Sequence, residues 1–197
     1  MGKAPTKDNT NGAVPAEVLS GKTYWGLRTD GTWGLQTGTM PDSCCACNGT
    51  VIGTRWCDNG DGTVTDLTTC LVWLKKANYG GPYPWRSSNT TYPWMYMDAH
   101  LRASQLYDGY PGSDLTDGSV IGNWRLPTKT ELEWLANGPE AVRSGTPQAF
   151  TGVQSAYYWS STNHINVDMA YGVNMGTRLT SAKLKEEVLW VWPVRSG

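Results

Sequence analysis

The cysteines are the residues whose chemistry depends most on spacing, because all five lie between Cys44 and Cys70. A zinc site could start from the C-x-x-C pair of Cys44 and Cys47, but no second such pair follows and no histidine is near, so a metal is disfavoured. Disulfides are the favoured alternative. We expect Cys57 and Cys70, which flank a predicted hairpin, to form one, and one cysteine is left over whatever the connectivity.

Residues 58–66, with the sequence DNGDGTVTD, gather carboxylates in a glycine-rich stretch. Such a stretch could form a calcium loop, since Ca²⁺ takes carboxylate and carbonyl oxygens as ligands. The EF-hand spacing is absent, because no glutamate stands at position 12 of such a loop. Asn-Gly and Asp-Gly favour tight turns between strands on their own. We therefore expect a turn here, with no metal and no other cofactor.

Candidate catalytic residues lack partners. His100 is predicted to be a surface residue of a helix, and nothing near it in the sequence supplies a nucleophile. Ser160 and Ser161 have no neighbouring base, and the G-x-S-x-G elbow is absent. We expect no catalytic residues, and we expect the protein not to be an enzyme.

The composition indicates a single main domain with an aromatic core and many turns. The chain has 11 Trp and 10 Tyr against one Phe, together with 23 Gly and 11 Pro, in 197 residues. The net charge is -1 and there is no basic run, so binding to nucleic acid or to an acidic membrane surface has no support. No run approaches the roughly 18 apolar residues of a membrane span, so membrane insertion is not expected.

Residues 123–136, NWRLPTKTELEWLA, predict the unit that must position the rest of the domain. Trp124 and Leu126 alternate with polar neighbours, as in a short strand that buries one face. Thr128 is a helix N-cap candidate, and Glu131 completes a T-x-x-E capping box. The helix is predicted to end at Asn137-Gly138-Pro139. The pattern is therefore a strand that turns into a short amphipathic helix.

The whole chain is predicted to have three parts, and this unit lies in the third. Residues 1–20 are polar and without period, and indicate a flexible arm. Residues 21–42 hold two similar aromatic runs, YWGL and TWGL, around an Asp-Gly turn, and predict a Trp/Gly-rich hairpin followed by a linker. Residues 43–197 form the main domain. A lone hairpin is marginal in water, so we expect this one to dock on the domain or on another copy of itself.

Within the main domain, the apolar residues of the segment 67–74 predict a buried strand that ends at Lys75-Lys76; they are Leu67, Leu71, Val72, Trp73 and Leu74. Residues 78–93 predict an irregular loop anchored by Trp85. Residues 94–106 fit one face of a helix, and residues 107–121 predict a long loop rich in Gly and Asp.

Residues 168–175 alternate with a strict period of two, which predicts a strand with a core face and a solvent face. The large apolar residues assigned to the core are Met169, Tyr171, Val173 and Met175. The small or polar residues assigned to solvent are Asp168, Ala170, Gly172 and Asn174. Loops are expected over residues 163–167 and 176–182, and a closing strand over residues 189–195. From the residues alone, a plain solvated strand is the better interpretation of the polar face.

Several segments, taken in order, resemble the Lcl C-terminal-domain family. They are DNGDGTVTD, the strand that contains Trp73, a helix, NWRLPT-x-x-E-L, YYWSST and VWPVRSG, and they cover residues 55–197. The resemblance implies an α+β chain with a C-type-lectin-like fold, built from short twisted antiparallel strands and two helices, here preceded by the hairpin arm. Cys57 and Cys70 depart from the family pattern, so their pairing is not implied by it. The calcium-binding motifs E-P-N and W-N-D are missing, so calcium-dependent sugar binding is not implied either.

The C-terminal third resembles a subset of this family, the variable proteins of diversity-generating retroelements. The framework YYWSST, AYGVNMG and VWPVRSG carries this resemblance, which implies a variable region over residues 157–197. Asparagine codons mutated at adenines cannot give Lys, Glu, Gln, Met or Trp, and residues 163–168 and 176–182 contain none of these. The implied ligand-binding residues are Asn163, His164, Ile165, Asn166, Asp168, Ala170, Gly172, Asn174, Thr177 and Arg178.

The function that the resemblance implies is recognition of a protein or glycan ligand by a homo-oligomer, with a trimer favoured. The implied location is extracellular, on a bacterial cell surface or a phage tail. The alternatives are a structural cap that trimerises a fibre and a glycan-binding adhesin domain without diversification. Formylglycine-generating enzymes share the fold and a W-R-L-P-T segment, but they depend on cysteines late in the domain, and this chain has none after Cys70.

Overall fold

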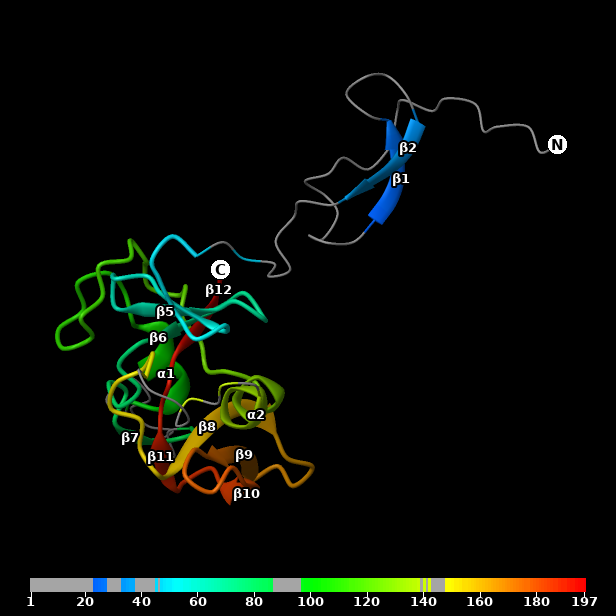
Figure 1. Ribbon diagram of the computed structural model, residues 1–197. Coiled ribbons are helices and arrows are strands. Elements are labelled where there is room, and N and C mark those ends of the chain that lie inside the picture. Colours follow the sequence, from blue (N-terminus) through cyan, green and yellow to red (C-terminus); the bar gives the residue numbers. More distant parts are fainter. Residues whose placement is uncertain are drawn as a thin grey trace. The chain divides into compact units, whose positions relative to one another are not determined.

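The computed structural model describes residues 23–27, 33–37, 45, 47–86, 97–138, 140, 142 and 148–197 (Figure 1). The expected arm over residues 1–20 lies outside these ranges. The chain divides into two compact units, Met1–Ala46 and Cys47–Gly197.

The first unit contains the predicted hairpin. Its strands are β1 (Thr23–Leu27) and β2 (Trp33–Thr37), and they pair antiparallel with Gly26 opposite Gly34. The hairpin prediction is therefore confirmed for the backbone.

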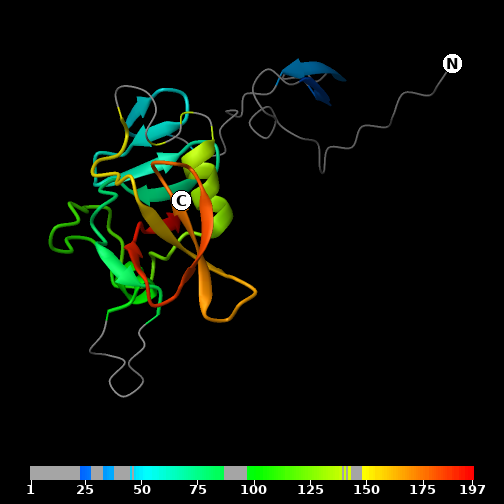
Figure 2. The ribbon, with the colours of Figure 1, turned by 90° about the horizontal axis from the view of Figure 1, so that it is seen from below.

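The second unit is built on two five-stranded sheets (Figure 2). The first sheet is antiparallel and has the order β12-β6-β5-β4-β3. Its strands are β3 (Thr50–Ile52), β4 (Trp56–Asp58), β5 (Thr63–Asp66), β6 (Leu71–Leu74) and β12 (Val194–Ser196). The predicted buried strand over residues 67–74 is confirmed as β6, but it begins only at Leu71, because residues 67–70 form a turn.

The second sheet has the order β10-β9-β8-β11-β7, with one parallel pair between β11 and β8. Its strands are β7 (Pro82–Pro84), β8 (Tyr157–Asn163), β9 (Met169–Asn174), β10 (Thr180–Leu184) and β11 (Val188–Trp190). The expected single closing strand over residues 189–195 is wrong, because β11 and β12 belong to different sheets. Pro193 offers no N–H to a ladder, and the chain crosses between the sheets there with Trp192 fully buried.

Two short helices join the sheets, so the domain is mostly β with a mixed α+β composition. α2 (Lys129–Asn137) begins at the predicted cap, where Thr128 accepts from the Glu131 N–H and Glu131 completes the capping box. α1 (Ala99–Ser104) begins later than predicted, because the Asp98 side chain caps it by accepting from the Leu101 N–H. The segment at 124–126 forms a single bridge, Arg125 to Val194, instead of a strand. Among the described residues, no helix is long and apolar enough to cross a membrane.

The core is aromatic, as the composition predicts, and it has two clusters. The larger cluster joins α2 to both sheets, and in it the rings of Trp73 and Trp192 meet edge to face at 5.8 Å between centroids. The smaller cluster joins α1 to β8 and β9 through Ala103, Trp159 and Ala170. Aromatic pairs in this geometry contribute about 0.5–1.5 kcal/mol beyond the area that they bury.

The disulfide prediction is wrong in its pairing. Cys57 is bonded to Cys47, with 5.5 Å between the Cα atoms, and Cys70 is also disulfide-bonded but not to Cys57. The register explains the error, because β5 lies beside β4 and places Thr65 opposite Cys57. Cys70 lies beyond the next turn, at φ 59°, immediately before β6.

The acidic stretch at residues 58–66 is a tight turn between β4 and β5, as predicted. Gly60 and Gly62 have φ values of 79° and 86°, which glycine adopts without a side-chain clash. Asp61 accepts from the Thr63 N–H and O–H, while Asp58 pairs with Lys75 at 2.6 Å. Both carboxylates therefore stabilise the turn itself. No cluster of metal-ligating side chains occurs in the part of the chain that the structure describes.

Candidate recognition surface

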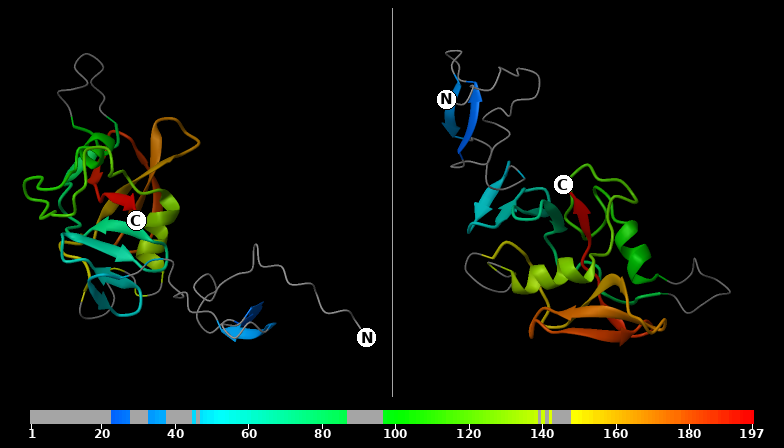
Figure 3. Two further views of the ribbon diagram at one scale, coloured as in Figure 1. Left: turned by 90° about the horizontal axis from the view of Figure 1, so that it is seen from above. Right: turned by 90° about the vertical axis from the view of Figure 1, so that its right-hand side faces the viewer.

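The residues implied as ligand contacts lie at the end of β8, on β9 and in the connections that follow these two strands. In the right-hand view of Figure 3, α2 lies along one face of these orange strands. The expected loop over residues 176–182 is shorter than predicted, because β10 begins at Thr180 and pairs with β9 with Thr180 opposite Val173. The two connections that remain are residues 164–168 and residues 175–179.

The predicted solvent face of β9 is wrong for Ala170 and Gly172, which are buried. Ala170 packs in the smaller core cluster with the α1 alanines and Trp159. A Cβ added to Gly172 would lie 3.1 Å from Leu189 Cδ1. Small residues alternate here because neighbouring elements approach closely, and not because that face meets solvent.

The predicted core face of β9 is only partly buried. Val173 and Met175 are buried as expected, but Met169 and Tyr171 are half-buried. Tyr171 lies beside α2, with Lys129 Nζ 4.7 Å from its ring centroid. Both faces of β9 are therefore covered, and no open strand face is left for a ligand.

The remaining implied residues divide between the two ends of β9. Those exposed are Asn163, Ile165, Asn166, Asp168, Thr177 and Arg178, whereas His164 and Asn174 are half-buried. The six residues of β9 separate the two connections by about 20 Å, at roughly 3.3 Å per residue. The structure therefore does not bring the implied residues together into one patch.

The connection at residues 164–168 holds itself in one conformation by local hydrogen bonds. Asn166 N donates to His164 Nδ1 at 3.1 Å, and Asp168 N donates to Asn166 Oδ1 at 3.0 Å. The His164 ring packs against Tyr171 with 5.3 Å between centroids. Asp168 pairs with Arg86 at 3.1 Å. Asn166 thus shapes the turn with its side-chain oxygen.

A buried lysine fixes the base of this connection. Lys185 is only 5% exposed, and its Nζ donates to Asn163 Oδ1 at 2.6 Å and to the Val167 carbonyl at 2.7 Å. Its ammonium lies 4.4 Å from the Trp85 ring centroid, and its backbone N–H donates to the Asp168 carbonyl. The predicted anchoring by Trp85 is confirmed, because Trp85 Nε1 donates to the Ser160 carbonyl at 2.7 Å.

The connection at residues 175–179 is a turn organised by Asn174. Its Oδ1 accepts from the N–H groups of Gly176 and Thr177, both at 2.9 Å. Arg178 has φ 63°, and its N–H donates to the Asn174 carbonyl. The side-chain oxygen of Asn174 is therefore committed to the turn.

Exposed apolar side chains gather around the lysine-anchored connection. We name the set the apolar rim: Ile165, Val167, Leu184 and Val188, which are 94%, 72%, 51% and 61% exposed. Lys185 joins the two segments of the rim, since it bonds to the 164–168 connection and lies in the turn between β10 and β11. Sequence analysis missed Val167, Leu184 and Val188. Their apolar character beside Asn, Lys and Glu was the signal that could have found them.

His100 is not the surface residue that the sequence predicts. Its ring packs edge-on against Trp85 with 4.4 Å between centroids, and it is half-buried. Burial lowers the pKa of His100, and the Lys185 charge adds to this, while Asp98 opposes it. The imidazole is therefore held neutral beside the Lys185 ammonium.

The model of the Lcl C-terminal domain matches residues 62–195, about two thirds of the chain. The chain belongs to the Lcl C-terminal-domain family. The matched part of this family member runs from β5 into β12, so it includes both helices and the whole apolar rim. The hairpin and the Cys47–Cys57 disulfide both lie before the first matched residue. A comparison with curated proteins found no match.

Proposed function

We propose that this Lcl C-terminal domain is a non-enzymatic ligand-binding domain with a C-type-lectin-like fold, and that the apolar rim contacts a protein ligand. One observation carries the proposal. Of the ten large apolar residues exposed in the described part of the chain, four form the apolar rim, on the 164–168 connection and at the two ends of the β10–β11 turn. Contiguous exposed apolar groups with a polar surround are typical of interaction sites.

The rim is also suited to binding because it is already ordered. Lys185 and the local hydrogen bonds of Asn166 fix the 164–168 connection before any ligand arrives. A preorganised loop loses less conformational entropy on binding than a free one. Exposed Glu186 and Glu187, with the Arg86–Asp168 pair, provide polar neighbours around the apolar centre. These features favour a protein surface over a glycan as the ligand.

Diversification by a retroelement is part of the same proposal, with display on a bacterial surface or a phage tail. Six of the ten implied positions are exposed, and an exposed substitution usually changes stability by about 0.5 kcal/mol or less. Sequencing the locus tests it. We expect a reverse-transcriptase gene and a near-repeat of codons 157–197 that differs at adenines. A locus with neither would remove diversification and leave the binding proposal standing.

Binding is tested with Ile165→Asp on an array of purified bacterial surface proteins and surface glycans. The array first identifies the proteins that the unmodified chain binds. Ile165→Asp should bind these proteins at least tenfold more weakly, because the added carboxylate must be desolvated at the rim. The melting temperature should not change, since Ile165 is 94% exposed. The matched control is Val120→Asp, which places the same charge at a 61% exposed position on the 107–121 loop. Loss of binding only in the Val120 variant would place the site elsewhere.

A further inference from the structure

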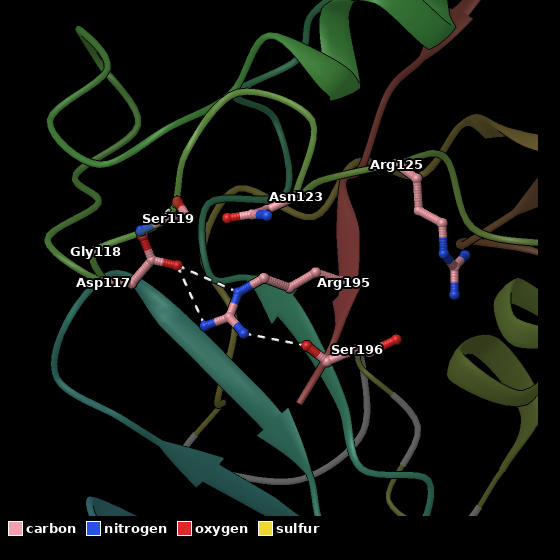
Figure 4. A pocket seen from close by; sticks show the side chains of 7 residues that line it. All are labelled: Asp117, Gly118, Ser119, Asn123, Arg125, Arg195 and Ser196. Atoms are coloured by element: carbon pink, nitrogen blue, oxygen red, sulfur yellow. Dashed lines mark hydrogen bonds and ion pairs between the residues drawn. The ribbon is translucent and has the colours of Figure 1, made fainter.

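A polar hollow of about 540 Å³ lies apart from the apolar rim, between the 117–119 loop, the Asn123–Arg125 segment and β12 (Figure 4). Nothing in the proposed function uses it. Its lining includes Asp117, Ser119, Asn123, Arg125, Arg195 and Ser196.

Arg195 is held in place within this hollow. The Asp117 side chain is fully buried, and its Oδ2 lies 3.3 Å from both Nε and Nη2 of Arg195. Asp117 is itself fixed, because its Oδ1 accepts from the N–H and the O–H of Ser119. The Arg195 guanidinium lies 5.4 Å from the Trp124 ring centroid, and Nη1 donates to the Ser196 carbonyl at 3.1 Å. The cation is therefore preoriented before any ligand binds.

Donor groups remain open in the hollow. A guanidinium has five N–H groups, and the contacts with Asp117 and Ser196 use three of those of Arg195. Asn123 accepts from the Val120 N–H through Oδ1 at 2.8 Å, while its Nδ2 has no hydrogen-bond partner within the described ranges. Figure 4 shows the Arg195 guanidinium pointing toward Asp117, and the Asn123 side chain lying on the Ser119 side of the hollow with its amide oxygen toward Ser119.

The charges decide which ligand these donors suit. Arg125 is paired with Glu131 through two contacts of 2.8 Å and points away from the other donors in Figure 4. The Arg195 side chain is 25% exposed and the Asp117 side chain is 0% exposed, so the accessible charge is the cation. A dianion would bring a second charge toward buried Asp117, and a neutral sugar would need acceptors for its hydroxyl hydrogens. A carboxylate needs donors alone.

We propose that the hollow binds a carboxylate group, which accepts from the free N–H groups of Arg195 and from Asn123 Nδ2. The carboxylate can belong to a small organic acid or to an acidic monosaccharide. Calorimetry on the full chain with glucuronate, acetate, glucose and inorganic phosphate tests this. We expect glucuronate to bind at least tenfold more tightly than glucose and phosphate. Acetate binding equal to glucuronate would identify the carboxylate alone as the ligand, and weaker acetate binding would show that the sugar ring contributes.

Asn123→Asp is the decisive variant. It keeps the oxygen that accepts from the Val120 N–H, but it removes the amide donor and adds a repelling charge, so glucuronate should bind at least tenfold more weakly. Asn166→Asp is the matched control, because that side chain also accepts a backbone N–H in a turn and does not line the hollow. It should change binding less than twofold. Glucose or phosphate binding as tightly as glucuronate, or no binding of glucuronate, would overturn the proposal.

A second measurement holds even if Asn123→Asp fails to fold. In the unmodified chain, glucuronate should shift the NMR resonances of the Asn123 side-chain amide and of Arg195 Nε–H, and leave the Asn166 amide unshifted. Equal shifts at both asparagine side chains would overturn a specific site in the hollow.

Discussion

Arg55, Lys185 and Arg195 share one arrangement at the scale of single residues: each lies against an indole ring and binds oxygens from a distant segment. Arg55 and Asp66 are both 1% exposed and form two hydrogen bonds, of 3.1 and 2.7 Å, beside Trp56. A buried pair of this kind is strongly destabilising to break, by about 3–5 kcal/mol, because one charge is left unpaired. These cations fix loops that have little apolar area of their own.

The neutral imidazole of His100 predicts how stability responds to acid. Its pKa in the folded state is below the usual 6.5, so the unfolded chain takes up a proton first as pH falls. The contribution of neutral His100 is therefore fully present above pH 6.5 and is lost as pH falls below it toward the folded-state pKa. Lys185 faces the ring and resists its protonation, while Asp98 favours it.

Denaturant unfolding from pH 7.5 to pH 5 checks this for the unmodified chain and for His100→Gln. The unmodified chain should lose stability below pH 6.5, and the variant should lose less over the same window because glutamine does not titrate. Equal slopes in the two chains would show that the histidine is not held neutral by the fold.

At the scale of elements, the sequence patterns predicted which helices and strands exist better than they predicted which faces of these elements are buried. The capping box at Thr128 and Glu131 is local chemistry and was predicted correctly. Burial acts to raise the pKa of Glu131, but the hydrogen bonds from Arg125 and Thr128 together outweigh it and lower that pKa. The strand β9 was predicted, but its faces were not, since α1 and α2 cover both of them. The Cys57 pairing failed similarly, because strand order decides which cysteine is near.

The 164–168 connection should depend on Lys185 for its order. Lys185→Met keeps the stem against Trp85 and removes the donors to Asn163 and Val167. The free energy of unfolding should therefore fall by about 1–3 kcal/mol. Hydrogen exchange should rise across residues 164–168. The control is Lys183→Met, two residues earlier in β10, where a half-buried ammonium lies 3.6 Å from Glu187 and contributes about 1 kcal/mol or less. Equal exchange in both variants would show that the lysine does not anchor the connection.

At the scale of the whole molecule, the family and the order of its elements were predictable because the matching segments are spread along residues 62–195. The recognition surface was only half predictable. The 163–168 positions are exposed except for half-buried His164, but the apolar rim also uses residues from the β10–β11 turn. Nothing local in the sequence shows that this turn lies beside the 164–168 connection. That proximity depends on Lys185, whose contacts are with residues 18 and 22 positions away.

The hairpin β1–β2 leads to the last prediction. Its register places Trp25 opposite Leu35 and Leu27 opposite Trp33, so positions 25, 27, 33 and 35 share one face of the hairpin. The four residues at these positions are all large and apolar, and an isolated two-stranded hairpin is at best marginally stable in water. We expect this face to associate with copies of itself, as a trimer. Light scattering should then give a mass three times the 21.6 kDa of one chain.

Trp25→Ser with Trp33→Ser removes the large groups from that face and should give a monomer, while Tyr24→Ser with Gln36→Ser changes the opposite face and should leave the trimer intact. Each double variant changes one residue of β1 and one residue of β2, so any general effect on the hairpin is matched. The melting temperature of the main domain should be the same in the two double variants when both are diluted until they are monomeric. An unmodified chain that is already a monomer, or a double tryptophan variant that still trimerises, would assign self-association to another surface.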